Sequence, residues 1–215
     1  MSGVSHEMKN HVAMVRSYAE MIKDLSGDNP EQRNAHLDVI IEESDCLNLL
    51  LGDFFTLTRA RSGLLPLLPE SFYVRPVLAQ IIGQYEFLYG GEYTFNVFCA
   101  SDINVSADRE KIRTVITALL NNAMIYCGDS KRILVSVMDT VSSVRFEFTG
   151  YGEILDRKTV SQMWDAYRES NAGFGSSKPG SGLGLVVAGE LLSMHDAEFG
   201  VKSDPASGNV FWFEL

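Results

Sequence analysis

The sequence predicts an α+β protein in which a helical hairpin precedes a domain of helices layered on a mainly antiparallel sheet. Three observations support this prediction. Apolar residues recur at helical spacing as far as residue 62. Gly63, Pro66 and Pro69 then interrupt the helical pattern. Beyond Pro69, segments with the alternation of strands lie between helical segments, which is typical of helices packed on a sheet.

We expect a first helix from residue 5 to about residue 25, because apolar residues alternate there in steps of four and three. These residues are Met8, Val12, Val15, Ala19 and Ile22. A breaker at residues 26–30 precedes a second helix, expected from Glu31 to about Ser62. Its apolar stripe consists of Leu37, Ile40, Ile41, Leu47, Leu51, Phe54 and Leu57. Two long helices joined by a short turn form an antiparallel hairpin.

The hairpin needs a further packing partner. A lone hairpin buries one face of each helix, whereas both of these helices are apolar on more than one face. We expect a second copy of the chain to cover the remaining face, which gives a homodimer with a four-helix bundle. The alternative is that the stripe packs against the second half of the same chain.

The second half is expected to alternate helices and strands. Helices are expected at about residues 74–88, 107–126 and 182–194. Strands are expected at about residues 93–99, 133–138, 144–148, 198–203 and 209–214. Residues 150–181 are expected to be loose, because glycines occur at positions 150, 152, 173, 175 and 180.

Composition limits the class of protein. The 215 residues suit one large domain or two small ones, and the net charge of −10 argues against a nucleic-acid interface. Cys46, Cys99 and Cys127 show neither a disulfide framework nor metal-ligand spacing, which favours a reducing cytoplasm. Without a signal peptide or an apolar run of about 20 residues, no membrane contact is expected from this chain itself. The abrupt start fits a trimmed fragment or a short natural chain.

The first helix carries, near its start, a histidine that can act as a nucleophile. Glu7 stands beside His6, and Asn10 lies one turn later on the same helix face. A carboxylate can accept a proton from one imidazole nitrogen and leave the other nitrogen free to attack phosphorus. The amide of Asn10 can orient a phosphate or a water molecule. The alternative is that His6 is an ordinary surface histidine.

A glycine-rich turn runs directly into the last predicted helix. It consists of Gly180, Ser181, Gly182, Leu183, Gly184 and Leu185. Backbone N–H groups at such a helix start commonly hold phosphate, and Lys178 is close enough in sequence to touch a γ-phosphate. The alternative is a flexible turn. A phosphate cradle together with a nucleophilic histidine indicates phosphoryl transfer from a nucleotide to protein.

Together the two motifs resemble the phosphoacceptor box and the second glycine box of bacterial sensor histidine kinases. The first box reads HEMKNH at residues 6–11, with His11 in place of the family's proline, so we expect a straighter helix. The resemblance implies that residues 1–65 form a dimerisation and phosphotransfer hairpin. It implies that residues 66–215 form an α/β sandwich ATPase domain of the histidine kinase and chaperone superfamily type.

The helix predicted at residues 107–126 ends in a run similar to the family's asparagine box. The resemblance places Asn122 on the asparagine that holds Mg²⁺ against the ATP phosphates, and Tyr126 also matches. A neutral carbonyl oxygen suits Mg²⁺, which takes its other ligands from water and phosphate. Ala118 replaces the first asparagine of the box, and Ile125 replaces a phosphate-contacting lysine. The alternative for Asn122 is a polar residue at a helix end.

Gly150 and Gly152 match the family's first glycine box, which contacts the nucleotide. Phe148 stands where the family carries the aspartate that accepts a hydrogen bond from the adenine amino group. Strand alternation places Phe148 on the face of Phe146, with Glu147 on the other face. An adenine amine buried without an acceptor would cost roughly 1–3 kcal/mol.

Two later segments also resemble the family. Met163-Trp164-Asp165-Ala166-Tyr167 resembles the aromatic box that anchors the lid, although plain aromatic packing explains these residues equally well. The closing strands follow the family pattern, with Asn209 where a threonine is usual.

The resemblance implies a sensor histidine kinase core that autophosphorylates His6 from Mg²⁺-ATP, with Glu7 as base or orienting group. The phosphoryl group would then pass to an aspartate on a response regulator receiver domain. Such a core lies in the cytoplasm, either free or as part of a membrane-anchored sensor. Phe148, Ala118 and Ile125 favour a rival, a pseudokinase or docking module with weak or no ATP binding. A serine kinase or chaperone-type ATPase of the same superfamily would have no use for the hairpin.

Overall fold

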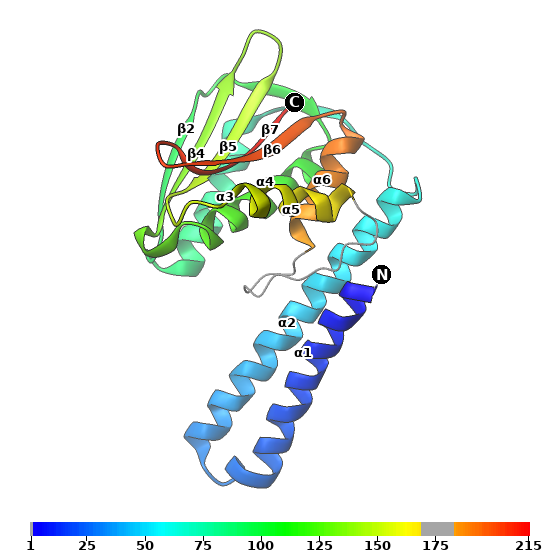
Figure 1. Ribbon diagram of the computed structural model, residues 1–215, viewed down its shortest axis with the longest axis vertical. Helices are drawn as coiled ribbons and strands as arrows, with labels where there is room; N and C mark the ends of the chain where they lie inside the picture. The colour runs from blue at the N-terminus through cyan, green and yellow to red at the C-terminus, as the bar shows by residue number, and fades with distance from the viewer. Residues whose placement is uncertain (1, 169–182) are drawn as a thin grey trace.

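The computed structural model describes residues 2–168 and 183–215. A long helical hairpin projects from an α/β domain (Figure 1). Helix α1 spans Ser2–Met21, continues as a π-helix over Ile22–Ser26, and turns into helix α2 at Pro30–Arg61. The two long helices lie side by side in opposite directions, so the predicted hairpin is confirmed.

Polar capping fixes the turn of the hairpin. Asn29 precedes α2, and its side-chain oxygen accepts hydrogen bonds from the backbone N–H groups of Glu31 and Gln32, each at 3.2 Å. Pro30 takes the first helical position, where the missing N–H has no intrahelical partner to lose and the fixed φ suits the helix. The breaker predicted at residues 26–30 is therefore confirmed.

A five-stranded mixed sheet forms one layer of the α/β domain. Its spatial order is β2 (Thr94–Cys99), β4 (Arg132–Asp139), β5 (Val144–Gly150), β7 (Gly208–Glu214) and β6 (Glu198–Asp204). β2 pairs with β4 in parallel, and the other pairs of this sheet are antiparallel. Helices cover the face of the sheet that points toward the hairpin (Figure 1). These helices are α3 (Val74–Tyr89), α4 (Arg109–Ile125), α5 (Arg157–Arg168) and α6 (Gly184–Met194).

The main core lies between the sheet and its helices. Phe146 and Phe148 of β5 are fully buried and pair in register with Phe213 and Phe211 of β7. The rings of Phe146 and Phe213 stack with their centroids 4.3 Å apart. Leu119 of α4 is also fully buried in this cluster. Each such side chain contributes roughly 1.5–3 kcal/mol on leaving water, so this layer stabilises the middle of the sheet.

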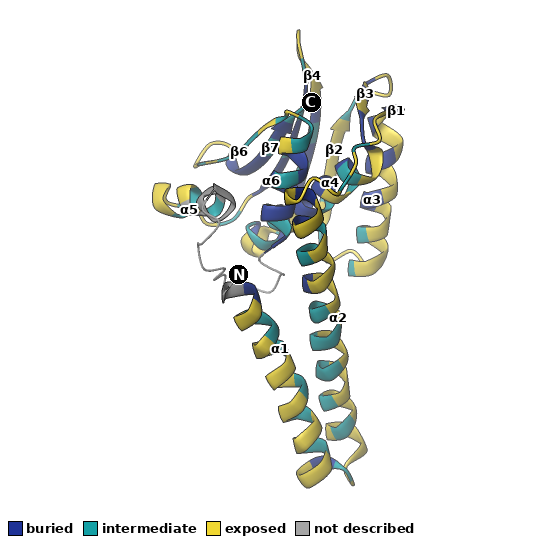
Figure 2. Ribbon diagram, turned by 90° about the vertical axis from the view of Figure 1, so that its right-hand side faces the viewer, coloured by how far each residue is buried: buried dark blue, intermediate teal, exposed yellow. Residues whose placement is uncertain are grey.

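Burial differs between the two parts of the molecule (Figure 2). Buried residues gather in the α/β domain, whereas much of the hairpin surface is exposed or half-buried. Across residues 2–168 and 183–215, no helix combines the length and the apolar character needed to cross a membrane.

A small second sheet is absent from the predicted elements. β1 (Glu70–Tyr73) and β3 (Asn104–Ala107) pair antiparallel, away from the five-stranded sheet. β1 buries Phe72 alone, and β3 buries Val105 and Ala107. Segments this short give too few repeats of the strand alternation to be recognised in a sequence.

The prediction that residues 150–181 are loose is wrong in part. Helix α5 occupies Arg157–Arg168, and the Asp156 carboxylate caps it by accepting a hydrogen bond from the Thr159 N–H at 2.6 Å. The glycines of this stretch lie before and after α5 and do not interrupt it. Residues 169–182, which include Gly173 and Gly175, lie outside the described residues.

Candidate functional site

His6 lies in the second turn of α1, at the end of the hairpin next to the α/β domain. Its side chain and that of Asn10 are exposed, whereas Glu7 is half-buried. The Glu7 Oε2 atom is buried and has no hydrogen-bond partner among the described residues. Burial raises the pKa of Glu7, and the nearby His11 opposes this shift. The carboxylate beside His6 is therefore a better proton acceptor than an ordinary glutamate.

His11 joins α1 to α2 one turn beyond Glu7. Its Nδ1 lies 2.5 Å from the Oε2 atom of Glu43, and both side chains are largely buried. The α1 helix runs without a break through this position. An interhelical hydrogen bond thus occupies the place where the family motif has a proline.

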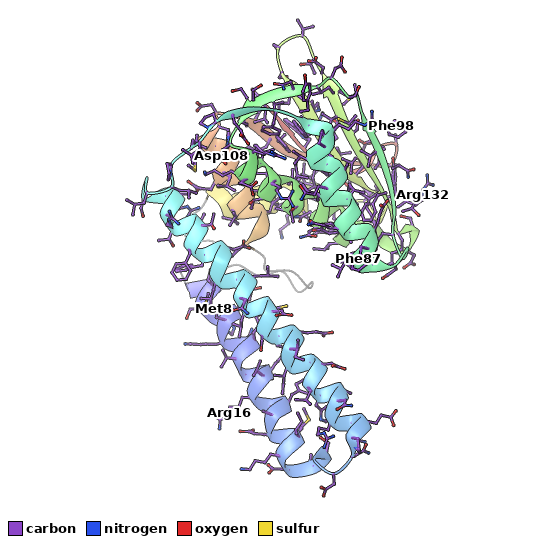
Figure 3. The ribbon with its side chains drawn as sticks, turned by 180° about the vertical axis from the view of Figure 1, so that it is seen from behind. Met8, Arg16, Phe87, Phe98, Asp108 and Arg132 are labelled. Atoms are coloured by element: carbon purple, nitrogen blue, oxygen red, sulfur yellow. The ribbon has the colours of Figure 1, made fainter. Side chains whose placement is uncertain are left out.

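A shallow concavity of about 410 Å³ runs along α1 beside the His6 turn. It is lined by Ser5, Met8, Lys9, Val12, Ala13 and Arg16. Met8 lies nearer the α/β domain, and Arg16 lies farther toward the tip of the hairpin (Figure 3). The concavity combines an apolar floor with two cations.

The glycine-rich turn is described only where it enters α6. Lys178, Gly180, Ser181 and Gly182 lie outside the described residues, as do the side chains of Trp164 and Tyr167 in the aromatic segment. Gly184 is the first residue of α6, with Leu183 before it and Leu185 after it. Leu183 and Leu185 have different neighbours, because Leu185 packs against the main core of the α/β domain.

Leu183 connects the glycine-rich turn to the hairpin. Its side chain is fully buried in a small cluster with Val4 of α1 and Leu50 of α2. Met8 and Phe54 pack against the same cluster. Val4 and Met8 flank His6 by two residues on either side. The start of α6 therefore lies against the very turn of α1 that carries His6.

The C-terminal end of α4 holds Asn122 and Tyr126. Asn122 is half-buried, and its Nδ2 donates a hydrogen bond to the Ala118 carbonyl at 2.8 Å. This bond orients the amide and directs its oxygen, the atom that a magnesium ion would use, away from the helix backbone. The Tyr126 ring stacks on Phe211 with centroids 5.8 Å apart, and burial raises the pKa of its hydroxyl.

Gly150 and Gly152 lie against the backbone at the end of α4. A Cβ added to Gly150 would lie 2.3 Å from the Ala123 carbonyl oxygen, and one added to Gly152 would lie 2.5 Å from the Tyr126 carbonyl oxygen. The N–H of Gly152 also donates to that Tyr126 carbonyl at 3.1 Å. Both glycines are therefore required for packing of β5 on α4, whether or not a ligand is present.

Phe148 lies in β5, at the position where the family motif has its aspartate. The side chain is fully buried and faces the helices, as the strand alternation predicts. Glu147 points to the opposite face of the sheet, where its carboxylate pairs with Arg145 at 2.7 Å. Glu147 therefore does not substitute for the missing carboxylate.

Asn209 has a structural role that the sequence analysis missed. It is fully buried, and its Nδ2 donates to the carbonyl oxygens of Tyr126 at 3.1 Å and Glu153 at 2.9 Å. Its Oδ1 accepts a hydrogen bond from the Ser203 hydroxyl at 2.6 Å, and that hydroxyl oxygen accepts one from the Leu155 N–H at 2.8 Å. A threonine could not reach all these groups. An isolated amide before the apolar run of β7 was the available signal.

The described residues include no group of three or more histidine, cysteine, aspartate or glutamate side chains placed to hold a metal ion. A magnesium ion at Asn122 would not need such a cluster of side chains, because substrate phosphates and water can supply most of its ligands. The Phe148 side chain does not suit the amino group of adenine, because a phenyl ring accepts no conventional hydrogen bond.

Two family profiles match the chain. The profile of the His Kinase A (phospho-acceptor) domain matches residues 1–63. The profile of the histidine kinase-, DNA gyrase B- and HSP90-like ATPase matches residues 107–215. This chain belongs to the sensor histidine kinase family. As a histidine kinase core, it combines the phosphoacceptor hairpin with the ATPase fold of its family.

Curated relatives of this histidine kinase core are longer proteins. Sensor protein SrrB of Staphylococcus aureus strain N315 is 25% identical over 222 residues, which cover 100% of this chain and 37% of SrrB. Sensor histidine kinase YvrG of Bacillus subtilis strain 168 is 25% identical over 215 residues, which cover 98% of this chain and 37% of YvrG. The chain thus spans little more than a third of the length of these relatives.

Solved histidine kinases share the fold. The Acinetobacter baumannii histidine kinase AdeS superposes with a TM-score of 0.78 at 18% identity, over 98% of this chain and 96% of AdeS. Histidine kinase ThkA, in complex with response regulator protein TrrA, superposes with a TM-score of 0.75 at 18% identity, over 100% of this chain and 60% of ThkA. Full-length ShkA in complex with AMPPNP gives a TM-score of 0.65 at 17% identity, over 100% of this chain and 45% of ShkA.

Proposed function

We propose that His6 accepts the γ-phosphoryl group of ATP and passes it to an aspartate on a response regulator receiver domain. One observation carries this proposal. Leu183, at the end of the glycine-rich turn, packs in one cluster with Val4, and Met8 packs against that cluster. Val4 and Met8 lie on either side of His6 in α1. A phosphate held at the start of α6 would therefore lie close to an exposed imidazole. Residues 1–65 would act as the dimerisation and phosphotransfer unit, and residues 66–215 as the ATP-binding unit.

His6 would act as the nucleophile. Glu7, whose basicity is raised by burial, would accept the proton from one ring nitrogen while the other attacks the γ-phosphorus. A new N–P bond would form, the bond to the bridging oxygen would break, and ADP would leave. Asn10, exposed one turn later, would orient the transferred phosphoryl group. Most of the catalysis would come from positioning and charge neutralisation.

The nucleotide would lie between α4 and the glycine-rich turn. Backbone N–H groups of that turn and the positive end of the α6 dipole would hold its phosphates, with Lys178 at the γ-phosphate. Mg²⁺ would be held by the Asn122 oxygen and would offset the phosphate charge. Tyr126, Gly150 and Gly152 would form the adjoining wall.

The exposed faces of the hairpin support two protein partners. A stripe on α2 repeats at helical spacing and would form a homodimer through a four-helix bundle. It contains Leu37, Ile41, Leu51 and Phe55, which are 41%, 58%, 41% and 60% exposed. The concavity on α1 beside His6 would receive the receiver domain, a role supported by the ThkA structure with TrrA. The core would act in the cytoplasm.

Acid-labile phosphate on the chain, measured with γ-labelled ATP and Mg²⁺, tests the transfer to His6. His6→Gln should abolish the label, whereas the matched hairpin variant His36→Gln should keep it. Label that persists in folded His6→Gln would assign the phosphoacceptor elsewhere. A purified receiver domain added to the labelled chain should then take over the labelled phosphate during the assay.

Phe148 favours a second candidate function, a pseudokinase of the same fold. A buried phenyl ring stands in place of the adenine-binding aspartate of the family motif. Ala118 and Ile125 likewise replace the first asparagine of the asparagine box and its phosphate-contacting lysine. Thermal unfolding with Mg²⁺-ADP separates the two candidates, because nucleotide at a hundred times Kd should stabilise the fold by about 2.7 kcal/mol. No shift at millimolar nucleotide would favour the pseudokinase.

A further inference from the structure

Two backbone groups, one a hydrogen-bond acceptor and the other a donor, hold the imidazole of His195 at the C-terminal end of α6. Its Nδ1 lies 2.7 Å from the Leu191 carbonyl oxygen, and its Nε2 lies 3.1 Å from the backbone nitrogen of Asp108. A carbonyl oxygen only accepts a hydrogen bond, and a backbone N–H only donates one. The neutral ring therefore carries its proton on Nδ1 and uses the Nε2 lone pair to accept from Asp108.

Asp108 extends this contact to the segment between hairpin and sheet. It is buried at the start of α4, where its Oδ1 caps the helix by accepting from the Lys111 N–H at 3.2 Å. Its Oδ2 accepts from the backbone N–H of Leu68 at 2.9 Å and also pairs with the Lys111 ammonium. Asp108, labelled in Figure 3, thus joins the end of α6, the start of α4 and the connecting segment.

Asp108 and Glu190, two of the charged groups next to this junction, each form an ion pair. Burial alone would raise the pKa of Asp108, but hydrogen bonds from Lys111 and Leu68 outweigh it, so the pKa lies below its usual value. On the α6 side, Glu190 pairs with Arg61 of α2 at 3.0 Å. The remaining charged residues on adjoining segments are Glu70, Arg109, Glu110, Asp196 and Glu198. Asp108 therefore stays ionised at neutral and mildly acid pH.

We propose that His195 is a pH-sensitive fastener between α6 and α4. The neutral ring accepts the Asp108 N–H and keeps the two helix ends together. A doubly protonated ring places an N–H on Nε2 opposite the N–H of Asp108, with no acceptor between them, so this bond is lost. The fastener operates whether or not the domain binds nucleotide, and therefore goes beyond the proposed function.

The fastener bears on the geometry of the candidate site. α6 begins at the end of the glycine-rich turn, and α4 ends beside Asn122. Holding the opposite ends of these two helices together restricts how far they can slide past each other. Acid pH should therefore loosen α6 and the segment at Leu68 while the sheet remains intact.

The test uses the full chain labelled with ¹⁵N, titrated from about pH 8 to about pH 5.5, the range in which imidazoles change charge. NMR follows the His195 ring nitrogens and the Asp108 amide. Two variants separate the ring's two bonds. His195→Gln places an amide oxygen near the Nε2 position and does not titrate. His195→Asn keeps a donor near the Nδ1 position and does not reach Asp108.

At high pH we expect a single Nδ1–H tautomer, and the Asp108 amide signal should shift in the same pH step as the His195 ring. In urea, acidification should reduce the ratio of folded to unfolded protein about tenfold more in the wild type than in His195→Gln. His195→Asn should resemble the acidified wild type at both pH values. An Nε2–H tautomer, or equal pH dependence in wild type and His195→Gln, would overturn the proposal. The other histidines are common to all three proteins and cancel.

Discussion

Phe148 is the residue on which nucleotide recognition depends most. It is fully buried at the position where the family resemblance leads us to expect an adenine-binding aspartate. We predict that Phe148→Asp binds Mg²⁺-ADP about tenfold more tightly than Phe148→Leu, because a hydrogen bond to the adenine amine replaces an unpaired polar group. Isothermal titration calorimetry on both variants measures the ratio.

The Phe148→Leu variant controls for the space that either change opens in the core. Circular dichroism must first show that both variants are folded, because a carboxylate in this cluster is costly without a ligand. Equal or weaker affinity of the aspartate variant would place the base-binding wall elsewhere in the molecule.

Asp108 gives a stability prediction with a definite sign. Its pKa is lowered in the folded state, so its contribution is complete above the unfolded value of about 3.9 and is lost as pH falls through the folded value. Asp108→Asn keeps a good helix cap but loses the charge. We expect it to destabilise the fold by about 1–3 kcal/mol near neutral pH, and by much less once the pH falls below the folded-state pKa of Asp108.

Urea unfolding at both pH values checks this prediction. Asp102→Asn, in the exposed turn before β3, is the matched control and should change stability little at either pH. A loss that is the same in acid as at neutral pH would mean that packing, rather than charge, accounts for the effect.

The packing of β5 on α4 depends on two glycines. Gly150→Ala or Gly152→Ala would place a methyl group within 2.5 Å of a backbone carbonyl oxygen, which side chains cannot relieve by rotation. We expect each to destabilise the fold by about 1–3 kcal/mol. Gly83→Ala in α3, where a Cβ meets nothing within 4 Å, should instead stabilise it by about 0.5–1 kcal/mol.

Thermal unfolding without nucleotide distinguishes packing from binding. If Gly150→Ala and Gly152→Ala unfold like the wild type and lose only ADP affinity, these glycines serve the ligand and not the α4 contact. The Gly83 variant shows in the same assay that a glycine-to-alanine change is not harmful by itself.

Long periodic elements were predictable from the sequence, and short or distant ones were not. α1, α2 and α4 carry several turns of apolar periodicity, and Pro30 and Asn29 mark the turn between the first two. β1 and β3 are too short to show a period. α5 was missed because the glycines around it outweighed the capping signal of Asp156.

The candidate site divides in the same way. His6, Glu7 and Asn122 could be named because they stand in local sequence motifs. The contacts of Leu183 with Val4 and Leu50, and those of Asn209 with Tyr126, join residues far apart in the chain. No local pattern encodes such contacts, since they arise only when the elements pack.

At the scale of the whole molecule, the exposed apolar stripe of α2 predicts association. Ile41→Glu places a charge in the middle of the proposed four-helix bundle, where it would have to be buried. We expect the wild-type chain to be a dimer and Ile41→Glu to be largely monomeric at micromolar concentration, as measured by light scattering after size exclusion.

Val141→Glu is the matched control for this prediction. Val141 is a fully exposed apolar residue in the turn between β4 and β5, far from the hairpin. Its variant should remain dimeric. A wild-type monomer, or dissociation of both variants alike, would contradict the α2 stripe as the dimer interface.

The burial of Leu183 has a mechanical consequence. Its side chain has no exposed surface and is enclosed by residues of both long helices, so it must follow them when they rotate or slide. Force arriving along the hairpin would therefore reach the start of α6 through this leucine, in addition to the ion pair between Arg61 and Glu190. A rotation of the two long helices would in this way shift the first residues of α6 without altering the sheet behind it.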